Sequence, residues 1–423
     1  MKKTDLSLCH LEKIQTPFGL REVYDSILFC NRCGSCLQAC PIYKLSPLEI
    51  NSPRGRNQAA RLVLERKLNV QELALQHSFH ACTLCGRCTQ VCAAKIPTAQ
   101  HVLEMHRILQ KHRLPKSLHF FLTLQGTRPH LFKKITRFAS ALYPLWNVIS
   151  WLPGFKWISL VKKRLPKKAV PLQTVLLKNN ISWTSIKPKF IYMPSLEAEF
   201  LQPQIAVSSL KLLNRLGKTD CWFNTACGLF EYVYGDLRQS KRLVRNLIRK
   251  HRKIKQGTCP LVTDSLDVYH FLKQVPQLFT RHKQLYKQAS LFADQVYFIT
   301  EFFPKKIPNV ISFPTPVQLN YGALFSRESH PISQSTSLFK TLFKQNFVEC
   351  GYTSFDTPAY GYAFTAGNQH EQILLELVKQ IAQQQIKTVF TFSGLCALEL
   401  NVALCRFYPA AKAHHIVSIA DKV

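Results

Sequence analysis

Acidic residues are scarce in this chain of 423 residues. It has 24 aspartates and glutamates against 56 lysines and arginines, which gives a formal net charge of +32. Such a charge favours an acidic protein partner, an anionic membrane surface or a nucleic acid, without choosing among them. Hydrophobic residues make up 46% of the sequence, so we expect a globular protein with two or three domains rather than a disordered chain.

Long apolar segments are also missing. The N-terminal residues include no apolar run typical of a signal peptide, so we expect a cytoplasmic protein. The most apolar stretch, residues 138–155, is barely long enough to span a bilayer, and two prolines interrupt it. We therefore predict no transmembrane helix. Tryptophans and lysines flank this stretch, which favours peripheral contact with the inner face of the cell membrane. The alternative is packing against the rest of the protein.

Familiar catalytic and nucleotide-binding motifs are absent. The chain has no Walker A loop, no G-x-G-x-x-G segment and no H-E-x-x-H pair. No nucleophile stands with a recognisable base, so we assign no catalytic residue. The sequence thus gives no support for direct binding of a nucleotide or flavin.

Cysteine, in contrast, is abundant and clustered. Eight of the 15 cysteines lie in two runs, each with the spacing C-x₂-C-x₂-C-x₃-C of bacterial ferredoxins. A disulfide framework is a poor interpretation for a chain this long without a signal peptide. Structural zinc is the other alternative, but zinc sites usually take two C-x₂-C pairs. The spacing therefore predicts two [4Fe–4S] clusters.

The motif also predicts which cysteines bind which cluster. The first three cysteines of a run surround one cluster, and the fourth reaches the other. We therefore assign Cys30, Cys33, Cys36 and Cys92 to cluster one, and Cys82, Cys85, Cys88 and Cys40 to cluster two. Gly34 and Gly86 allow the backbone to approach the cluster sulfides closely.

Residues 30–43, CNRCGSCLQACPIY, and the segment SPRGR that follows carry a family resemblance. The chain resembles the iron–sulfur subunit of glycolate oxidase, whose relatives include the lactate-utilisation iron–sulfur protein and one of the subunits of anaerobic glycerol-3-phosphate dehydrogenase. The resemblance implies an electron relay from flavoprotein dehydrogenase subunits, acting on glycolate or lactate, to a quinone-linked respiratory acceptor. Ala93 departs from the proline usual in that family, at a position that does not bind iron.

The sequence divides into four segments. Residues 1–115 hold both cysteine runs and show helical periodicity, so we predict an α-helical ferredoxin domain. Residues 116–185 form a basic, aromatic connector. Residues 186–305 and 306–423 are predicted to be two α/β repeats, because the segment 189–200 is similar to 309–320. The loop around Cys259 and the segment ending at Cys396 are interpreted as equivalent.

The resemblance further implies two cysteine-rich repeats, each with a single cysteine, a Cys-Cys-Gly element and a later cysteine, which together can hold another cluster. Here Ser195 and Val317 occupy the leading positions, and Cys227, Cys259 and Cys396 alone remain at the others. We expect a degenerate scaffold or docking unit. The alternative is a metal bound by Cys227 and Cys259 with a nearby histidine.

Two further functions compete with the electron relay. The positive charge fits a nucleic-acid-binding or redox-sensing iron–sulfur protein, although the lack of a recognisable nucleic-acid module disfavours it. The lost C-terminal cysteines fit a divergent paralogue that keeps its clusters without the ancestral complex. The basic stretch 241–255 is interpreted as an amphipathic helix packed on a sheet; an anchor to anionic lipid or an acidic partner is the alternative.

Overall fold

The computed structural model describes most of the chain outside the connector. The described residues are 14–16, 19–69, 72–109, 172–233, 236–254, 257–303, 316–320, 330–343, 347–349 and 367–421, with 124 and 131. The apolar stretch 138–155 lies outside them, as do Cys9, Cys350 and most of the connector. Within these residues, no helix is long and apolar enough to cross a membrane.

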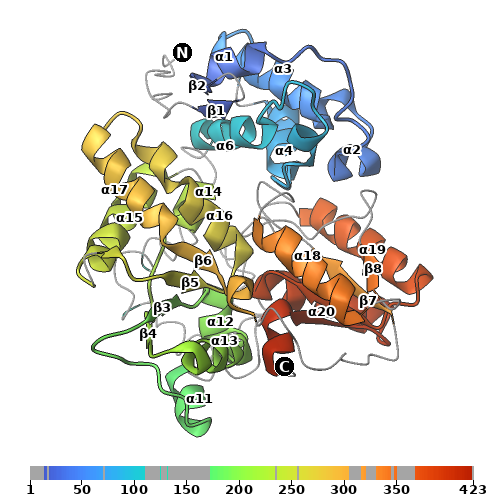
Figure 1. The fold of residues 1–423 in the computed structure, drawn as a ribbon. Helices are drawn as coiled ribbons and strands as arrows, with labels where there is room; N and C mark the ends of the chain where they lie inside the picture. The colour runs from blue at the N-terminus through green and yellow to red at the C-terminus, as the bar shows by residue number, and fades with distance from the viewer. Residues whose placement is uncertain are drawn as a thin grey trace.

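The N-terminal part is a bundle of short helices (Figure 1). A small antiparallel pair, β1 (Ile14–Thr16) and β2 (Gly19–Arg21), precedes them. The helices are α1 (Val23–Leu28), α2 (Pro41–Leu45), the 3₁₀ turn η2 (Glu49–Asn51), α3 (Pro53–Leu64), α4 (Leu73–Ala81), α5 (Arg87–Gln90) and α6 (Thr98–Leu109). α3 packs on α1 and α6. The expected helical character is therefore confirmed here, with the strand pair as an addition.

The sequence explains why α3 begins where it does. Ser52 caps the helix, because its hydroxyl accepts the backbone N–H of Gly55 at 2.8 Å. Pro53 follows at the first helical position, where its missing N–H costs nothing. Small and apolar side chains then recur at helical spacing on the buried face, including Ala59, Ala60 and Val63.

The first α/β unit contains a four-stranded parallel sheet in the order β4-β3-β5-β6. Its strands are β3 (Phe190–Met193), β4 (Thr219–Cys221), β5 (Leu261–Thr263) and β6 (Val296–Phe298). The helices around it are α11 (Leu172–Lys178), α12 (Leu196–Phe200), α13 (Pro203–Leu216), α14 (Leu229–Val233), α15 (Leu237–Arg252), α16 (Leu266–Gln274) and α17 (Lys283–Asp294), with the 3₁₀ segments η6 (Val275–Phe279) and η7 (Ile299–Phe302). Every residue of β3 is buried, as expected for a strand covered on both faces.

The second unit repeats this topology. Its parallel sheet has the order β8-β7-β9-β10, so both sheets place their strands in the order second, first, third, fourth. The strands are β7 (Val317–Asn320), β8 (Phe347–Glu349), β9 (Thr388–Thr391) and β10 (Lys412–His415). The helices are α18 (His330–Phe343), α19 (Gly367–Gln383), α20 (Gly394–Phe407) and the 3₁₀ segment η10 (Ile416–Asp421). Residues 309–315 of the segment compared with 189–200 lie outside the described part. The predicted equivalence of Val317 and Ser195 is wrong, because Val317 begins β7 whereas Ser195 follows β3.

The two units meet through polar contacts at the carboxyl ends of their strands. The backbone N–H of Leu266, after β5, donates to the carbonyl of Phe392, after β9, at 3.1 Å. A ring nitrogen of His415 lies 2.8 Å from the carbonyl oxygen of Asp264. The Ser393 hydroxyl donates to Glu197 at 3.2 Å. Corresponding edges of the two sheets therefore face each other.

The supposed equivalence of Cys259 and Cys396 is wrong. Cys259 precedes β5, and its sulfur lies 3.7 Å and 3.6 Å from the carbonyl oxygens of Pro188 and Lys189, before β3. Cys396 follows β9, in the first turn of α20. Because all strands of each sheet are parallel, a residue before a strand and a residue after one lie at opposite edges.

Candidate functional site: two four-cysteine centres

Four cysteines from both motifs line one cavity in the helical part. Cys40 of the first run lies there with Cys82, Cys85 and Cys88 of the second. The structure thus brings together the four residues predicted for cluster two. Cys40 directly precedes α2, and Cys82 directly follows α4. These helix ends carry residues distant in sequence to the same place.

The electrostatics of the thiols connect these four cysteines and also reach Cys36 of the first run. Burial raises the pKa of Cys82 to about 11, and also raises the pKa of Cys85. The pKa of Cys88 is raised well above its usual value by burial and then by neighbouring thiolates, those of Cys85, Cys82, Cys40 and Cys36. Thiolates crowded in this way need a bound cationic centre to remain charged.

The loop predicted to hold cluster one is more open. Cys33 is exposed, whereas Cys30, Cys36 and Cys92 are partly buried. Hydrogen bonds from Ser35 lower the pKa of the Cys33 thiol. Among the described residues, Cys36 interacts electrostatically with Cys30 and Cys40, and no described contact joins Cys92 to this loop. Its place in cluster one therefore stays a prediction.

Two glycines have the backbone conformation that these loops require. Gly34 has φ +90° and Gly86 has φ +72°, values that other residues rarely adopt. Gly86 directly precedes α5, which carries Cys88. Both glycines occupy the same position in their motif, between the second and third cysteines, so the sequence repeat is matched by a repeat in backbone shape.

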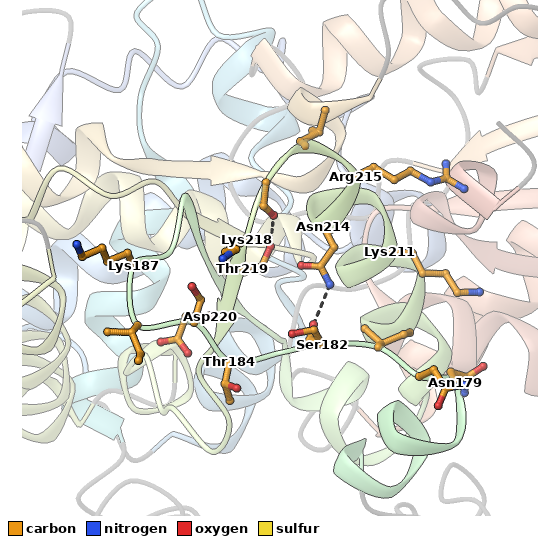
Figure 2. Close-up of a pocket in the computed structure, with 16 residues that line it drawn as sticks. Asn179, Ser182, Thr184, Lys187, Lys211, Asn214, Arg215, Lys218, Thr219 and Asp220 are labelled. Atoms are coloured by element: carbon orange, nitrogen blue, oxygen red, sulfur yellow. Dashed lines mark hydrogen bonds between the residues drawn. The ribbon is translucent and has the colours of Figure 1, made fainter.

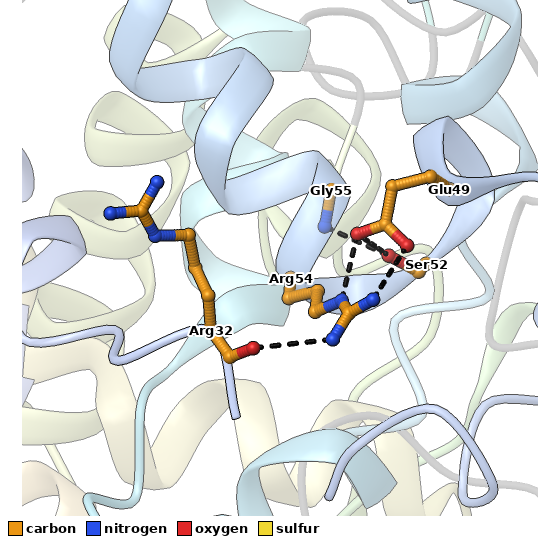
Figure 3. A network of polar contacts seen from close by, with 5 residues as sticks. All are labelled: Arg32, Glu49, Ser52, Arg54 and Gly55. Carbon is orange, nitrogen blue, oxygen red and sulfur yellow. Dashed lines mark hydrogen bonds and ion pairs between the residues drawn. The ribbon is translucent and has the colours of Figure 1, made fainter. Parts of the chain in front are cut away.

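The SPRGR segment ties the first cysteine loop to α3 (Figure 3). The Arg54 guanidinium donates to both carboxylate oxygens of Glu49, at 2.8 Å and 3.1 Å. It also donates to the carbonyl of Arg32, inside the loop, at 3.2 Å. The backbone N–H of Arg54 donates to the sulfur of Cys36. Arg54 therefore contacts the loop through its backbone and its side chain.

The second arginine of the segment points to the other centre. Arg56 is 2% exposed and lines the four-cysteine cavity. Its Nε donates to the carbonyl of Ser78 at 2.9 Å, and Nη1 lies 3.8 Å from the sulfur of Cys40. One short segment thus supports both cysteine centres.

These donors suit an iron–sulfur cluster. The four side chains that converge are all cysteines, the soft ligands that iron–sulfur clusters take, and an N–H donor stands beside them. Comparison with known proteins agrees, because residues 26–96 match the family model described as a 4Fe-4S dicluster domain. Residues 26–96 form a 4Fe–4S dicluster domain.

The chain is also similar to curated proteins, two of which are named as iron–sulfur subunits. The glycolate oxidase iron-sulfur subunit of Escherichia coli (strain K12) is 25% identical over 291 residues, which cover 66% of this chain and 64% of that protein. A probable glycolate oxidase iron-sulfur subunit of Bacillus subtilis (strain 168) is 31% identical over 104 residues, 24% of this chain and 23% of that one. Lactate utilization protein B of Macrococcus caseolyticus (strain JCSC5402) is 31% identical over 127 residues, 28% of this chain and 26% of that one. The predicted resemblance is thereby confirmed.

The matches do not span whole relatives. The chain covers just under two thirds of the Escherichia coli protein and about a quarter of the other two. No solved structure matches the chain.

The first α/β unit has a cavity of its own beyond the dicluster domain. Ser195 and Cys227, two of the positions expected from the family repeats, line it together with Glu199 and Glu231. Burial raises the pKa of Cys227 to about 12 and that of Glu231 to about 7. Cys259 lies at the opposite edge of the sheet, so the structure does not bring it to Cys227. Within the described residues, no three histidine, cysteine, aspartate or glutamate side chains surround a single metal ion.

A wide, open cleft lies at the amino edge of the same sheet (Figure 2). Lys187, Lys211, Arg215 and Lys218 line it among amide and hydroxyl side chains. Figure 2 shows the side chains of Lys211 and Arg215 extending away from that of Lys187. The cations therefore do not converge on one point, and they add to the basic surface rather than forming a pocket for a small anion.

Buried carboxylates between the two units were not predicted from the sequence. Glu197 and Asp264 are both 1% exposed or less, and burial raises the pKa of each, that of Glu197 to about 7. Asp264 accepts a hydrogen bond from the Ser195 backbone at 2.9 Å and another from the Tyr192 hydroxyl. The sequence shows only that acidic residues are few. It does not show which of these carboxylates are buried.

Proposed function

We propose that this chain is the electron-transfer iron–sulfur subunit of a flavin-dependent 2-hydroxyacid dehydrogenase complex, of glycolate or lactate type. The cavity lined by Cys40 and the three cysteines of the second run carries the proposal, because it unites both ferredoxin motifs in one centre. When bound, two [4Fe–4S] clusters would accept and release one electron at a time. The substrate and the flavin would lie on the partner subunits.

The surroundings of the two centres differ in a way that suits a relay. The loop of cluster one reaches the surface at Cys33, whereas Cys40 of cluster two is buried and its other three cysteines are partly buried. Electron transfer slows steeply with distance, so a partner must approach the exposed centre closely. Cluster one is therefore the point where we propose that the flavoprotein docks.

Three exposed apolar side chains lie close in sequence to the cysteines of cluster one or to Glu49. Leu28, Leu48 and Val91 are 46%, 60% and 44% exposed. In the sequence they lie next to or two residues from Cys30, Glu49 and Cys92, respectively. The Arg32 side chain extends away from the Glu49–Arg54 pair (Figure 3) and is exposed. Exposed apolar and basic side chains of this kind would suit a partner whose docking surface is apolar and acidic.

The acceptor is proposed to be quinone-linked. The helix α15 packs its apolar side chains, such as Leu243 and Leu247, into the protein and leaves Arg238, Arg242 and Arg249 exposed. The basic face suits contact with an acidic subunit or with anionic lipid at the inner face of the cell membrane. Retention on phosphatidylglycerol vesicles in low salt, lost on phosphatidylcholine vesicles, would support the membrane.

Substrate-dependent reduction of the clusters tests the proposal. Anaerobic extract from cells that contain the chain should bleach its cluster absorbance when glycolate or lactate is added. The same extract from cells that lack the chain should show no such bleaching. If neither acid reduces clusters that dithionite does reduce, the proposed substrate class is wrong.

A further inference from the structure

Arg56 is a buried cation without a carboxylate partner in the described part of the chain. Nε and Nη1 have the contacts already given, to Ser78 and Cys40. Its Nη2 is buried and has no hydrogen-bond partner among the described residues. A buried guanidinium with an unused donor is costly unless something negative lies beside it. The four cysteines of cluster two line the same cavity.

Among the described residues, the arginine that acts on cluster one is neither buried nor unpaired. Arg54, the nearest arginine of SPRGR to cluster one, is 30% exposed and pairs with Glu49. The two motifs also differ between their second and third cysteines, where the first has the exposed Ser35 and the second has the buried Arg87. The positive charge of Arg87 acts on the Cys85 thiol. Buried positive charge is therefore concentrated at cluster two.

We propose that Arg56, supported by Arg87, raises the reduction potential of cluster two and offsets the effect of its burial. This inference rests on the proposed function, which supplies the clusters. A one-electron reduction adds one negative charge to a centre already bound by four thiolates, and burial disfavours that charge. A fixed cation beside the centre stabilises the reduced form, and a hydrogen bond from Nη2 to a cluster sulfur would act in the same direction.

Potentiometric titration followed by EPR tests this inference on the full chain, purified anaerobically. Arg56→Gln should keep about eight irons, as expected for two cubes of four, and should lower the potential of one cluster only. Arg56→Lys keeps the positive charge but loses the several N–H donors of the guanidinium. The potential of cluster two in this variant should therefore lie between those of the wild type and Arg56→Gln. Arg54→Gln is the matched control, and it should leave the potential of cluster two unchanged.

Equal potentials in the wild type and Arg56→Gln, at equal iron content, would overturn the inference and leave the two-cluster assignment intact. If Arg56→Gln loses iron, the variant Arg87→Ser makes the same comparison with the residue of the first motif. An unchanged potential in iron-replete Arg87→Ser would then overturn the inference. A wild-type chain without clusters would instead refute the proposed function.

Discussion

Cys40 belongs to the first cysteine run, yet it lines the same cavity as Cys82, the first cysteine of the second run. Cys40 reaches this cavity because it directly precedes α2, whose first residue, Pro41, is buried. The four-cysteine cavity is therefore not built by the second run alone, since it needs a cysteine of the first run.

Replacing Cys40 should remove the centre that the second run mainly builds. Cys40→Ser is expected to hold about four irons per chain instead of about eight, because one cluster loses one of its four thiolate ligands and is not retained. Iron and acid-labile sulfide analysis measures this directly. Cys227→Ser is the control, since Cys227 lies in the first α/β unit, and it should keep the wild-type iron content. Loss of iron in both variants, or in neither, would contradict the assignment.

Gly55 should tolerate no side chain. A Cβ at this position would lie 1.9 Å from the carbonyl oxygen of Glu49, and backbone atoms cannot move away as a side chain can. Gly55→Ala is expected to destabilise the domain by about 1–3 kcal/mol, the usual cost of overpacking. The measurement is the midpoint of thermal unfolding, compared under anaerobic conditions.

Gly217→Ala provides the comparison for this variant. A Cβ there would approach the Cδ of Lys189, which belongs to a flexible side chain on an exposed residue. We expect a much smaller loss of thermal stability than for Gly55→Ala. Equal losses in the two variants would show that the contact with Glu49 is not the cause.

Glu197 should make the stability of the protein depend on pH. Its pKa is raised by burial from 4.5 to about 7 in the folded chain. Between these values the unfolded chain has released a proton that the folded chain still binds, so stability falls as pH rises. The thermal unfolding midpoint of Glu197→Gln should therefore rise relative to that of the wild type as the pH increases from 4.5 to 7. Glu371→Gln, at an exposed position on α19, is the control. Parallel curves for the wild type and Glu197→Gln would count against this account.

The exposed apolar side chain of Leu48 should be needed for electron entry at cluster one. Leu48→Glu places a negative charge beside the exposed loop and is expected to slow glycolate- or lactate-driven bleaching of the clusters about tenfold, which corresponds to about 1.4 kcal/mol. Dithionite reduction of the same variant should be unaffected. Leu291→Glu, at a residue equally 60% exposed on α17, should behave as the wild type. A similar slowing by both variants would place the docking surface elsewhere.

The sequence predicted the features that depend on local spacing. The cysteine runs predicted which four residues share the described cavity, and the change of periodicity near residue 186 predicted the α/β part. Neither pattern tells at which edge of a sheet a loop residue lies, so Cys259 was misplaced. The sequence also did not reveal that Arg56 is buried, since an arginine in a helix usually faces solvent. Its place on the face shared with Ala59, Ala60 and Val63 carries it inside. The contact between Glu197 and Ser393 needs two distant units to pack.

The central claim is that eight cysteines from two interdependent motifs hold two [4Fe–4S] clusters. Iron and acid-labile sulfide per chain, measured on anaerobically purified protein together with EPR of the reduced form, test it most directly. The account predicts about eight irons, about eight sulfides and the signal of two interacting [4Fe–4S] clusters. About four irons per chain, or zinc in place of iron, would contradict it.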